Sequence, residues 1–229
     1  MKRNLLLAFS AFVILISACK KDAPDFTGYD PTGVIDQPGN QFNESYLPAS
    51  KGTYWKYQVT TGAKIDTNVI TLTGEKTTMN GRTYLNIVGK ANNMPEQPGY
   101  YYAGDHIYTL TATSAGGYTL EFLYLNDTTK IGSTWIGKLT PTGTVNGVPA
   151  RLTGKMIEKN ITKVVLGKTF TNVTHTELNI EYDFLDGSGF KSYGKYDYYI
   201  AKGVGMIQID SEVYGGITSS QKIFDYGIK

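Results

Sequence analysis

Hydrophobic and polar residues alternate along most of the chain after its first fifty residues. In the segment 172–184, the even positions from Thr174 to Phe184 hold apolar residues or threonine, and the odd positions from His175 to Asp183 hold polar residues. A period of two places successive side chains on opposite faces of a β-strand. The pattern predicts a strand with one buried and one solvated face. Similar segments predict strands at 53–60, 64–73, 82–90, 106–112, 117–126, 150–159, 190–200, 205–214 and 218–226.

Short turns that contain glycine separate these segments. Asn-Gly and Gly-Gly pairs accept the positive φ angles that a two-residue hairpin turn needs. After the first twenty residues we find no segment with the 3.6-residue period of an amphipathic helix. The sequence therefore predicts an all-β fold of antiparallel meanders. The expected turns are Asn80-Gly81, Gly116-Gly117, Asn146-Gly147, Asp186-Gly187 and Gly215-Gly216.

Parts of the chain recur in the same order, which predicts an internal duplication. We expect two curved sheet units, 47–130 and 131–229, in a half-barrel or sandwich-like arrangement, with one joined sheet and two packed sheets both open. Each unit opens on a Gly-x-x-Trp strand whose tryptophan is buried. The matched segments are 52–55 with 132–135 and 72–74 with 152–154, both 80 residues apart, then 81–85 with 167–171 and 99–104 with 196–203.

The first nineteen residues have the organisation of an export signal. Lys2 and Arg3 precede an apolar run from Leu5 to Ile16, and small residues lead to Cys19, the only cysteine. A run of this length spans about 18 Å as a helix, which is shorter than the roughly 30 Å hydrocarbon core of a bilayer. We expect residues 1–18 to be a cleaved signal peptide rather than a retained membrane helix.

The segment 16–19, Ile-Ser-Ala-Cys, resembles the lipobox of bacterial lipoproteins. In that family the cysteine is acylated by fatty acids such as palmitate and becomes the first residue of the mature protein. The resemblance implies that Cys19 is the lipid attachment site and that the protein meets a membrane through its acyl chains. Acylation would also consume a cysteine that has no partner for a disulfide in an oxidising compartment.

Residues 19–46 predict a lipidated cysteine followed by a disordered tether. The segment holds Pro24, Pro31 and Pro38 and few aliphatic residues. Such a composition buries too little apolar surface to offset the entropy of ordering. A flexible coil of this length extends by roughly 30 Å, which holds the β-rich body, residues 47–229, clear of a membrane surface.

The charge of the mature chain argues against a nucleic-acid partner. Removal of residues 1–18 takes away Lys2 and Arg3, which leaves Lys plus Arg equal to Asp plus Glu at 20 each. A neutral chain lacks the basic surface that binds phosphate backbones.

The body resembles cell-envelope lipoproteins of Bacteroidota. The resemblance lies in the opening phrase 47–57, LPASKGTYWKY, and the closing phrase 198–207, YYIAKGVGMI. It implies an all-β domain, loosely like the half-barrels of lipoprotein carriers, in the cell envelope on the periplasmic or surface face of an outer membrane. The motifs are structural and imply no activity.

The sequence lacks the motifs of the common enzyme classes. We find no nucleophile elbow, phosphate loop or dinucleotide fingerprint, and His106 and His175 have no partner at metal-motif spacing. We therefore predict no catalytic residue, no metal and no cofactor. One alternative stays open, a hydrolase that uses the carboxylates of the 172–184 strand, Glu177, Glu181 and Asp183, with a histidine.

Two groups of tyrosines are the candidate binding surface. Consecutive tyrosines on strands alternate between the two faces, so each group places rings inside and outside the sheet. An exposed tyrosine offers an apolar ring and a polar hydroxyl, which suits glycan or protein contacts. The residues are Tyr100, Tyr101, Tyr102, Tyr193, Tyr196, Tyr198 and Tyr199.

These observations favour a lipid-anchored, non-enzymatic envelope protein. Its β domain would bind an apolar ligand in a concave sheet, or a glycan or envelope protein on its outer face. The alternatives are the carboxylate hydrolase and a structural scaffold that adds strands at its sheet edges.

Overall fold

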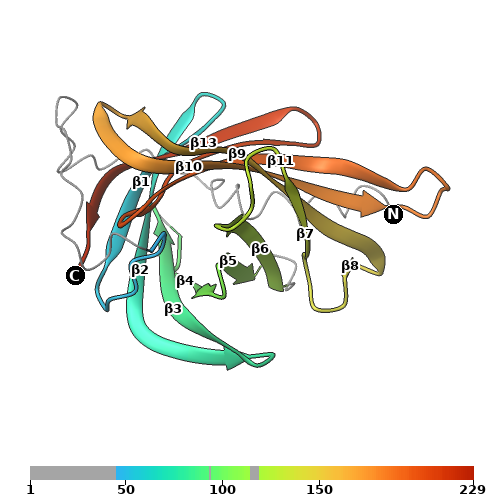
Figure 1. Ribbon diagram of the computed structural model, residues 1–229, viewed down its shortest axis with the longest axis horizontal. Helices are drawn as coiled ribbons and strands as arrows, with labels where there is room; N and C mark the ends of the chain where they lie inside the picture. Colours follow the sequence, from blue (N-terminus) through green and yellow to red (C-terminus); the bar gives the residue numbers. More distant parts are fainter. Residues whose placement is uncertain (1–44, 93, 114–118) are drawn as a thin grey trace.

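The computed structural model describes residues 45–92, 94–113 and 119–229, and these form one antiparallel sheet of 13 strands (Figure 1). The predicted all-β fold is confirmed. Within the described ranges, no helix has the length and apolar character needed to cross a membrane. The signal peptide and Cys19 lie outside the described residues.

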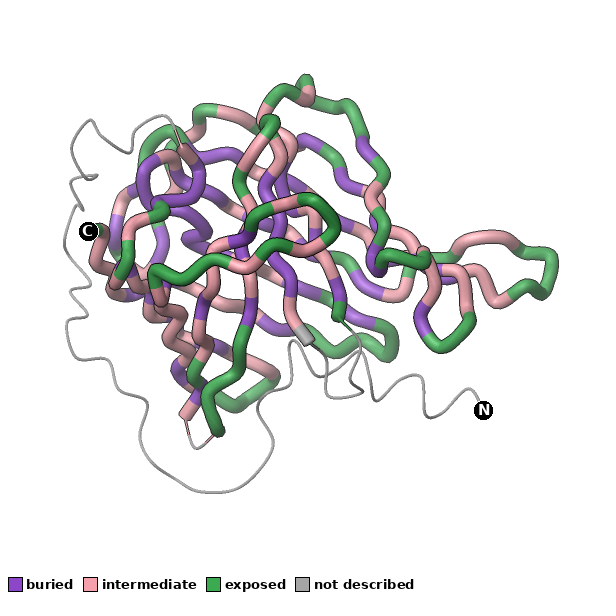
Figure 2. Tube along the Cα trace, turned by 90° about the horizontal axis from the view of Figure 1, so that it is seen from below, coloured by how far each residue is buried: buried purple, intermediate pink, exposed green. Residues whose placement is uncertain are grey.

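The strands follow the predicted alternation closely. In β10 the side chains of the even positions from Thr174 to Tyr182 are buried, and those of the odd positions from His175 to Asp183 are half-buried. Along many strands, buried residues alternate with half-buried or exposed ones (Figure 2). The strands are β1 (Tyr54–Thr61), β2 (Lys64–Met79), β3 (Arg82–Ala91), β4 (Gln97–Gly104), β5 (Ile107–Thr113), β6 (Thr119–Asn126), β7 (Thr134–Lys138), β8 (Thr144–Val145), β9 (Val148–Val165), β10 (Lys168–Asp183), β11 (Phe190–Ala201), β12 (Gly205–Val213) and β13 (Ile217–Gly227).

The sheet order joins the two halves of the chain into a single sheet. Strands β1 to β6 form a meander, as do β9 to β13, and the first and last strands of the domain pair in the middle of the sheet. The path ends at β6 on one side and at β7 on the other. The sheet is strongly curved, so these edge strands approach each other and the sheet is nearly closed (Figure 1).

Three predicted turns, Asn80-Gly81, Asn146-Gly147 and Gly215-Gly216, have two positive φ angles, whereas at Asp186-Gly187 only the glycine has one. Asn80 and Gly81 have φ angles of 50° and 77° between β2 and β3, and Asn146 and Gly147 have 53° and 77° between β8 and β9. The pair 116–117 lies outside the described residues. No strand range was predicted for β4 or β8, because proline, glycine or short length interrupts their alternation. For β7 the prediction was limited to the Gly-x-x-Trp segment 132–135, whose last two residues begin the strand.

The concave face of the sheet is filled by aromatic side chains. Tyr124 of β6 stacks on Tyr198 of β11 with ring centroids 5.8 Å apart, so opposite walls touch across the interior. Trp55 donates from Nε1 to the carbonyl oxygen of Val204 at 2.6 Å, and Tyr57 donates from its hydroxyl to Met206 at 2.8 Å. These bonds link β1 to the start of β12 through side chains rather than strand pairing.

The first described residues belong to this core. Tyr46, the last residue of the predicted tether, is buried, and its hydroxyl accepts a hydrogen bond from Thr174 at 3.0 Å. The backbone N–H of Gly203 donates to the oxygen of Ser45 at 2.8 Å. The packed domain therefore includes Ser45 and Tyr46.

Both halves open with the same hydrogen-bonded turn. The N–H of Gly52 donates to Leu72, whose own N–H donates to Thr53. Gly132 and Met156 repeat this arrangement in the second half, and both glycines have a positive φ, 79° and 84°. In this hydrogen-bond pattern Met156 is the counterpart of Leu72. The sequence comparison had instead matched Leu72 with Leu152. The duplication itself stays a prediction.

Candidate functional site

The edge strands β6 and β7 meet at a seam. The N–H of Glu121 donates to the carbonyl oxygen of Leu139 at 2.9 Å, and Nε1 of Trp135 donates to that of Leu123 at 3.2 Å. A tryptophan side chain and the segment after β7 therefore satisfy backbone groups that an edge strand would otherwise expose.

The β2–β3 hairpin forms a wall beside this seam. A bulge between Leu72 and Lys76 interrupts its pairing, and β3 pairs with β4 only from Leu85 to Gly89. The end of the hairpin therefore leaves the sheet. In Figure 1 it curls beneath β4 to β6. This bend carries the side chains of Arg82 and Tyr84 over to β6.

A groove of about 490 Å³ lies between the hairpin, the β7 segment and the face of β5–β6 that is opposite the aromatic core. A volume of this size suits a small ligand. We call it the seam groove. It is lined by Asn80, Arg82, Tyr84, Ile107, Thr109, Glu121, Leu123, Ile136, Gly137, Lys138, Thr140 and Pro141.

One corner of the seam groove is a charged network centred on Glu121. The hydroxyl of Tyr84 donates to its Oε2 at 2.7 Å, and Nη1 of Arg82 donates to its Oε1 at 3.2 Å. The guanidinium of Arg82 also lies 5.2 Å from the ring centroid of Tyr102. Burial, followed by the hydrogen bond to Glu121, raises the pKa of Tyr84 to about 12. Tyr84 is therefore a hydrogen-bond donor at neutral pH.

The floor and rim of the groove differ in character from this corner. Thr109 on the floor is only 1 % exposed, and its hydroxyl has no hydrogen-bond partner among the described residues. Ile136 on the rim is 68 % exposed, so its apolar side chain is open to a ligand. The groove thus combines fixed charges, an unsatisfied hydroxyl and an apolar wall.

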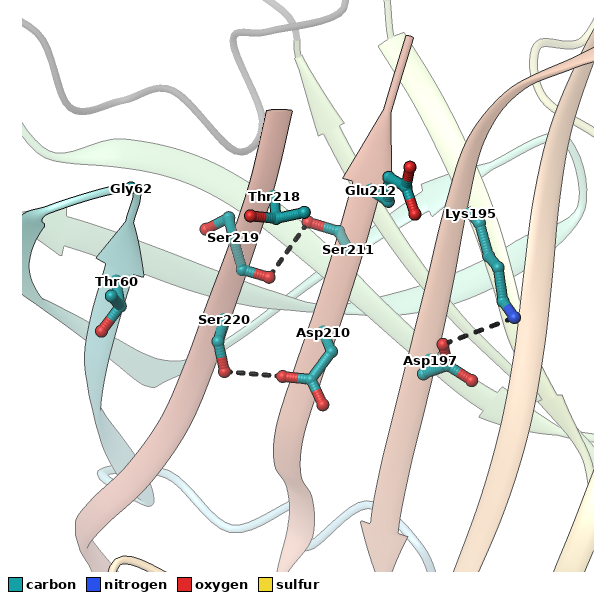
Figure 3. A pocket seen from close by; sticks show the side chains of 10 residues that line it. All are labelled: Thr60, Gly62, Lys195, Asp197, Asp210, Ser211, Glu212, Thr218, Ser219 and Ser220. Atoms are coloured by element: carbon teal, nitrogen blue, oxygen red, sulfur yellow. Dashed lines mark hydrogen bonds and ion pairs between the residues drawn. The ribbon is translucent and has the colours of Figure 1, made fainter. Parts of the chain in front are cut away.

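A second concave place, of about 400 Å³, lies over β1, β11, β12 and β13 (Figure 3). Its side chains are polar and partner one another. Ser220 donates from its hydroxyl to Oδ1 of Asp210 at 2.6 Å, and Nζ of Lys195 lies 3.9 Å from Oδ2 of Asp197. This arrangement is typical of the solvated face of a sheet, and none of the residues that line it has a hydrophobic side chain.

The carboxylates of the alternative hydrolase lie on the same solvated face in separate pairs. Glu177 accepts from Nζ of Lys195 at 2.6 Å, and Glu181 accepts from Nε of Arg151 at 2.6 Å. Asp183 Oδ1 accepts the N–H of Leu185. Each carboxylate therefore has its own donor, and the geometry gives no support to a shared acid–base site.

Both histidines contact other carboxylates. His175 lies between Asp197, 2.8 Å from its Nε2, and Glu158, 3.3 Å from its Nδ1, and stacks on Tyr199. His106 lies 2.8 Å from Asp127. Within the described residues, no group of three or more His, Cys, Asp or Glu side chains is placed to hold a metal ion.

The candidate tyrosines divide between core and surface. Three of them, Tyr101, Tyr196 and Tyr198, are buried in the aromatic core, so they offer no surface to a ligand. The others are half-buried. Tyr102 contacts Arg82 of the seam groove through its ring, whereas Tyr193 stacks on Tyr214 with centroids 4.8 Å apart.

The fold has known counterparts. The chain is similar to a protein of Parabacteroides distasonis ATCC 8503 described as a putative lipoprotein, with a TM-score of 0.50, 9 % identity and coverage of 80 % of this chain and 98 % of that one. A putative exported protein with a YmcC-like fold from Bacteroides fragilis NCTC 9343 gives a TM-score of 0.47, 9 % identity and coverage of 79 % and 98 %. No family model and no curated protein matches the sequence. The match to the Parabacteroides protein confirms the resemblance to Bacteroidota lipoproteins at the level of the fold alone.

Sequence reasoning did not find the residues of the seam groove. Arg82 and Tyr84 share a face at alternate positions after the Asn80-Gly81 turn, which was a usable signal. Their partner Glu121 lies on a strand 37 residues beyond Tyr84, and Thr109 looks like any strand threonine. Only the bend of the hairpin brings these side chains together.

Proposed function

We propose that the protein is a lipid-anchored component of a bacterial cell envelope that acts by binding a ligand in the seam groove. The signal peptide, the lipobox at Cys19 and the fold shared with a lipoprotein-like neighbour support the location. The observation that carries the binding role is the network of Glu121, Arg82 and Tyr84 beside an apolar rim.

The groove has the composition of a binding site rather than a catalytic one. Glu121 is the only acidic side chain among the described residues that line it, and two donors already hold its oxygens. Hydrolysis of a glycosidic bond by the usual route needs two carboxylates across the bond. Aromatic rings fill the concave face of the sheet, so the interior leaves little space for an apolar ligand.

The experiment for the location compares the natural chain with Cys19→Ala in a bacterial host supplied with an alkyne fatty acid. We expect acyl labelling and membrane fractionation of the natural chain, and loss of both in the variant. Labelling of the variant would overturn the lipid anchor at Cys19.

The experiment for the binding role is a ligand screen on the mature protein. Neutral disaccharides, phospholipid vesicles and peptides are compared, each with the natural chain and with Glu121→Gln. Binding of any class that Glu121→Gln weakens supports the seam groove as the site. Ligands that bind both chains equally, or no binding at all, overturn it.

A further inference from the structure

We infer that the ligand of the seam groove is a neutral saccharide of one or two rings. This inference rests on the proposed function and specifies its ligand. The carboxylate of Glu121 accepts hydrogen bonds from two donors, Arg82 and Tyr84. The groove beside them also contains Thr109, whose hydroxyl has no hydrogen-bond partner among the described residues.

Hydrogen-bonding capacity left over in the groove calls for a ligand rich in hydroxyls. Each oxygen of Glu121 accepts one bond from the network, and a carboxylate oxygen has room for a second. Arg82 uses one of its five N–H groups on Glu121. An adjacent acceptor and donor of this kind match two neighbouring sugar hydroxyls, since each hydroxyl both donates and accepts.

The buried hydroxyl of Thr109 is the independent observation. The residue Thr109 lines the groove and is almost fully buried, and its hydroxyl lacks a hydrogen-bond partner among the described residues. Leaving such a group unsatisfied costs about 1–3 kcal/mol. A ligand hydroxyl on the floor of the groove would recover this cost on binding.

The charges in the groove argue against a strongly charged ligand. Glu121 pairs with Arg82, and Lys138 leaves the lining with a single net positive charge, so the groove has no concentration of one sign that would select a strongly charged ligand. The apolar wall of Ile136 and Leu123 instead suits the C–H face of a sugar ring, which is apolar although the ring edge is polar. A neutral ring with a polar edge and an apolar face is complementary to both the charged corner and the apolar wall.

The seam itself argues against an extended peptide. A peptide that adds to a sheet edge bonds to free backbone groups of the edge strand. In β6 the N–H of Glu121 is taken by Leu139, and the carbonyl oxygen of Leu123 is taken by Trp135. Recognition in the groove therefore depends on side chains.

The test measures binding of neutral disaccharides by titration calorimetry or by NMR shift mapping. The probes are maltose, lactose, cellobiose and N,N′-diacetylchitobiose, with glucuronic acid and glucosamine as charged comparisons. We expect at least one neutral probe to bind, and Glu121→Gln to weaken it at least tenfold because the carboxylate acceptor is lost. The matched control is Glu177→Gln, which changes a paired carboxylate on the solvated face of β10 and should leave the affinity unchanged.

Thr109→Val separates recognition from folding. Valine keeps the shape of threonine but removes the unsatisfied hydroxyl, so the variant should unfold at the same temperature as the natural chain or higher. Its affinity for the saccharide should fall severalfold. A loss of affinity together with a loss of stability would count against a direct contact.

Three results would overturn the proposal that the ligand is a neutral saccharide. These are binding of no neutral probe at millimolar concentration, preference for a charged comparison, and affinities that both groove variants leave unchanged. If vesicles or peptides bind and Glu121→Gln weakens that binding, the saccharide proposal is wrong but the seam groove is still the binding site. A screen with no groove-dependent ligand of any class would remove both proposals.

Discussion

The indole of Trp135 lies directly over Gly154, the residue opposite it on β9. A Cβ atom built on Gly154 would fall 2.0 Å from Cε2 of the indole, so only glycine leaves room for the ring. The same indole donates to the carbonyl oxygen of Leu123 on β6. Glycine on one strand therefore lets a tryptophan reach across the seam to another.

Gly154→Ala should destabilise the domain because the indole must move. Overpacking of a filled site costs about 1–3 kcal/mol, and here the seam bond would be lost as well. Denaturant unfolding followed by tryptophan fluorescence measures both effects. Gly147→Ala is a control in open space with no atom within 4 Å of the new Cβ, although its positive φ adds strain. A Gly154→Ala protein as stable as the natural chain would contradict the packing described here.

The two tryptophans should differ in what their N–H groups contribute. Trp55 bonds to Val204 at 2.6 Å within the core, whereas Trp135 bonds to Leu123 at 3.2 Å in a partly buried position. Replacement by phenylalanine leaves a carbonyl oxygen without its donor, which costs about 1–3 kcal/mol when that oxygen is buried. We expect Trp55→Phe to cost more than Trp135→Phe in urea unfolding. The reverse order would mean that the seam, rather than the core, limits stability.

Acid should weaken the domain through Asp197. The hydrogen bond from His175, and then the charge of Lys195, lower the pKa of Asp197 below its ordinary 3.8. A lowered pKa means that the folded state favours the ionised carboxylate. Its stabilisation is therefore complete above about pH 4 and is lost as the pH falls through the folded value.

Asp197→Asn tests this relationship. The variant should lose less stability than the natural chain between roughly pH 5 and pH 2, as measured by denaturant unfolding. In a His175→Ala background, the difference between aspartate and asparagine should shrink, since the main donor is gone. Lys195, Lys163 and Glu158 also face this cluster, so a residual difference is expected.

Alkali should act on the seam groove through Tyr84. Its pKa is raised from 10.0 to about 12, so the folded state favours the neutral phenol. That stabilisation is present below about pH 10 and is lost as the pH rises toward 12. Tyr84→Phe should flatten this limb of the stability profile, with Tyr100→Phe as a control on a tyrosine outside the groove lining. Equal profiles for the natural chain and Tyr84→Phe would contradict the shift.

Local pattern was sufficient for much of the fold. In β10 the buried and half-buried positions follow the predicted alternation from Thr174 to Tyr182, because a strand has only two faces and the core takes one. The Asn80-Gly81 and Asn146-Gly147 turns were predictable for a similar reason, since few residues accept two positive φ angles. β4 contains Pro98 and Gly99, which break the pattern, so its limits needed the structure.

The candidate site was harder to predict from the sequence than the fold, because its residues come from distant strands. Tyr102 was a candidate and lies beside the groove, but its role there is to support Arg82. Tyr101 and Tyr198 belonged to the same candidate surface and are buried, since alternation fixes opposite faces without saying which one is outside. Glu121 carried no local signal at all.

The sequence by itself predicts an export signal with a lipobox-like Cys19, which stays a prediction, and it determined that the body is an antiparallel β domain with alternating faces. Those features depend on residues within a few positions of one another. Tertiary structure decided that β1 and β13 join the halves into one sheet, that aromatic rings fill its concave face, and that Arg82, Tyr84 and Glu121 meet. These depend on strand order and on the bend near Gly74, where distant residues are placed by curvature rather than by spacing along the chain.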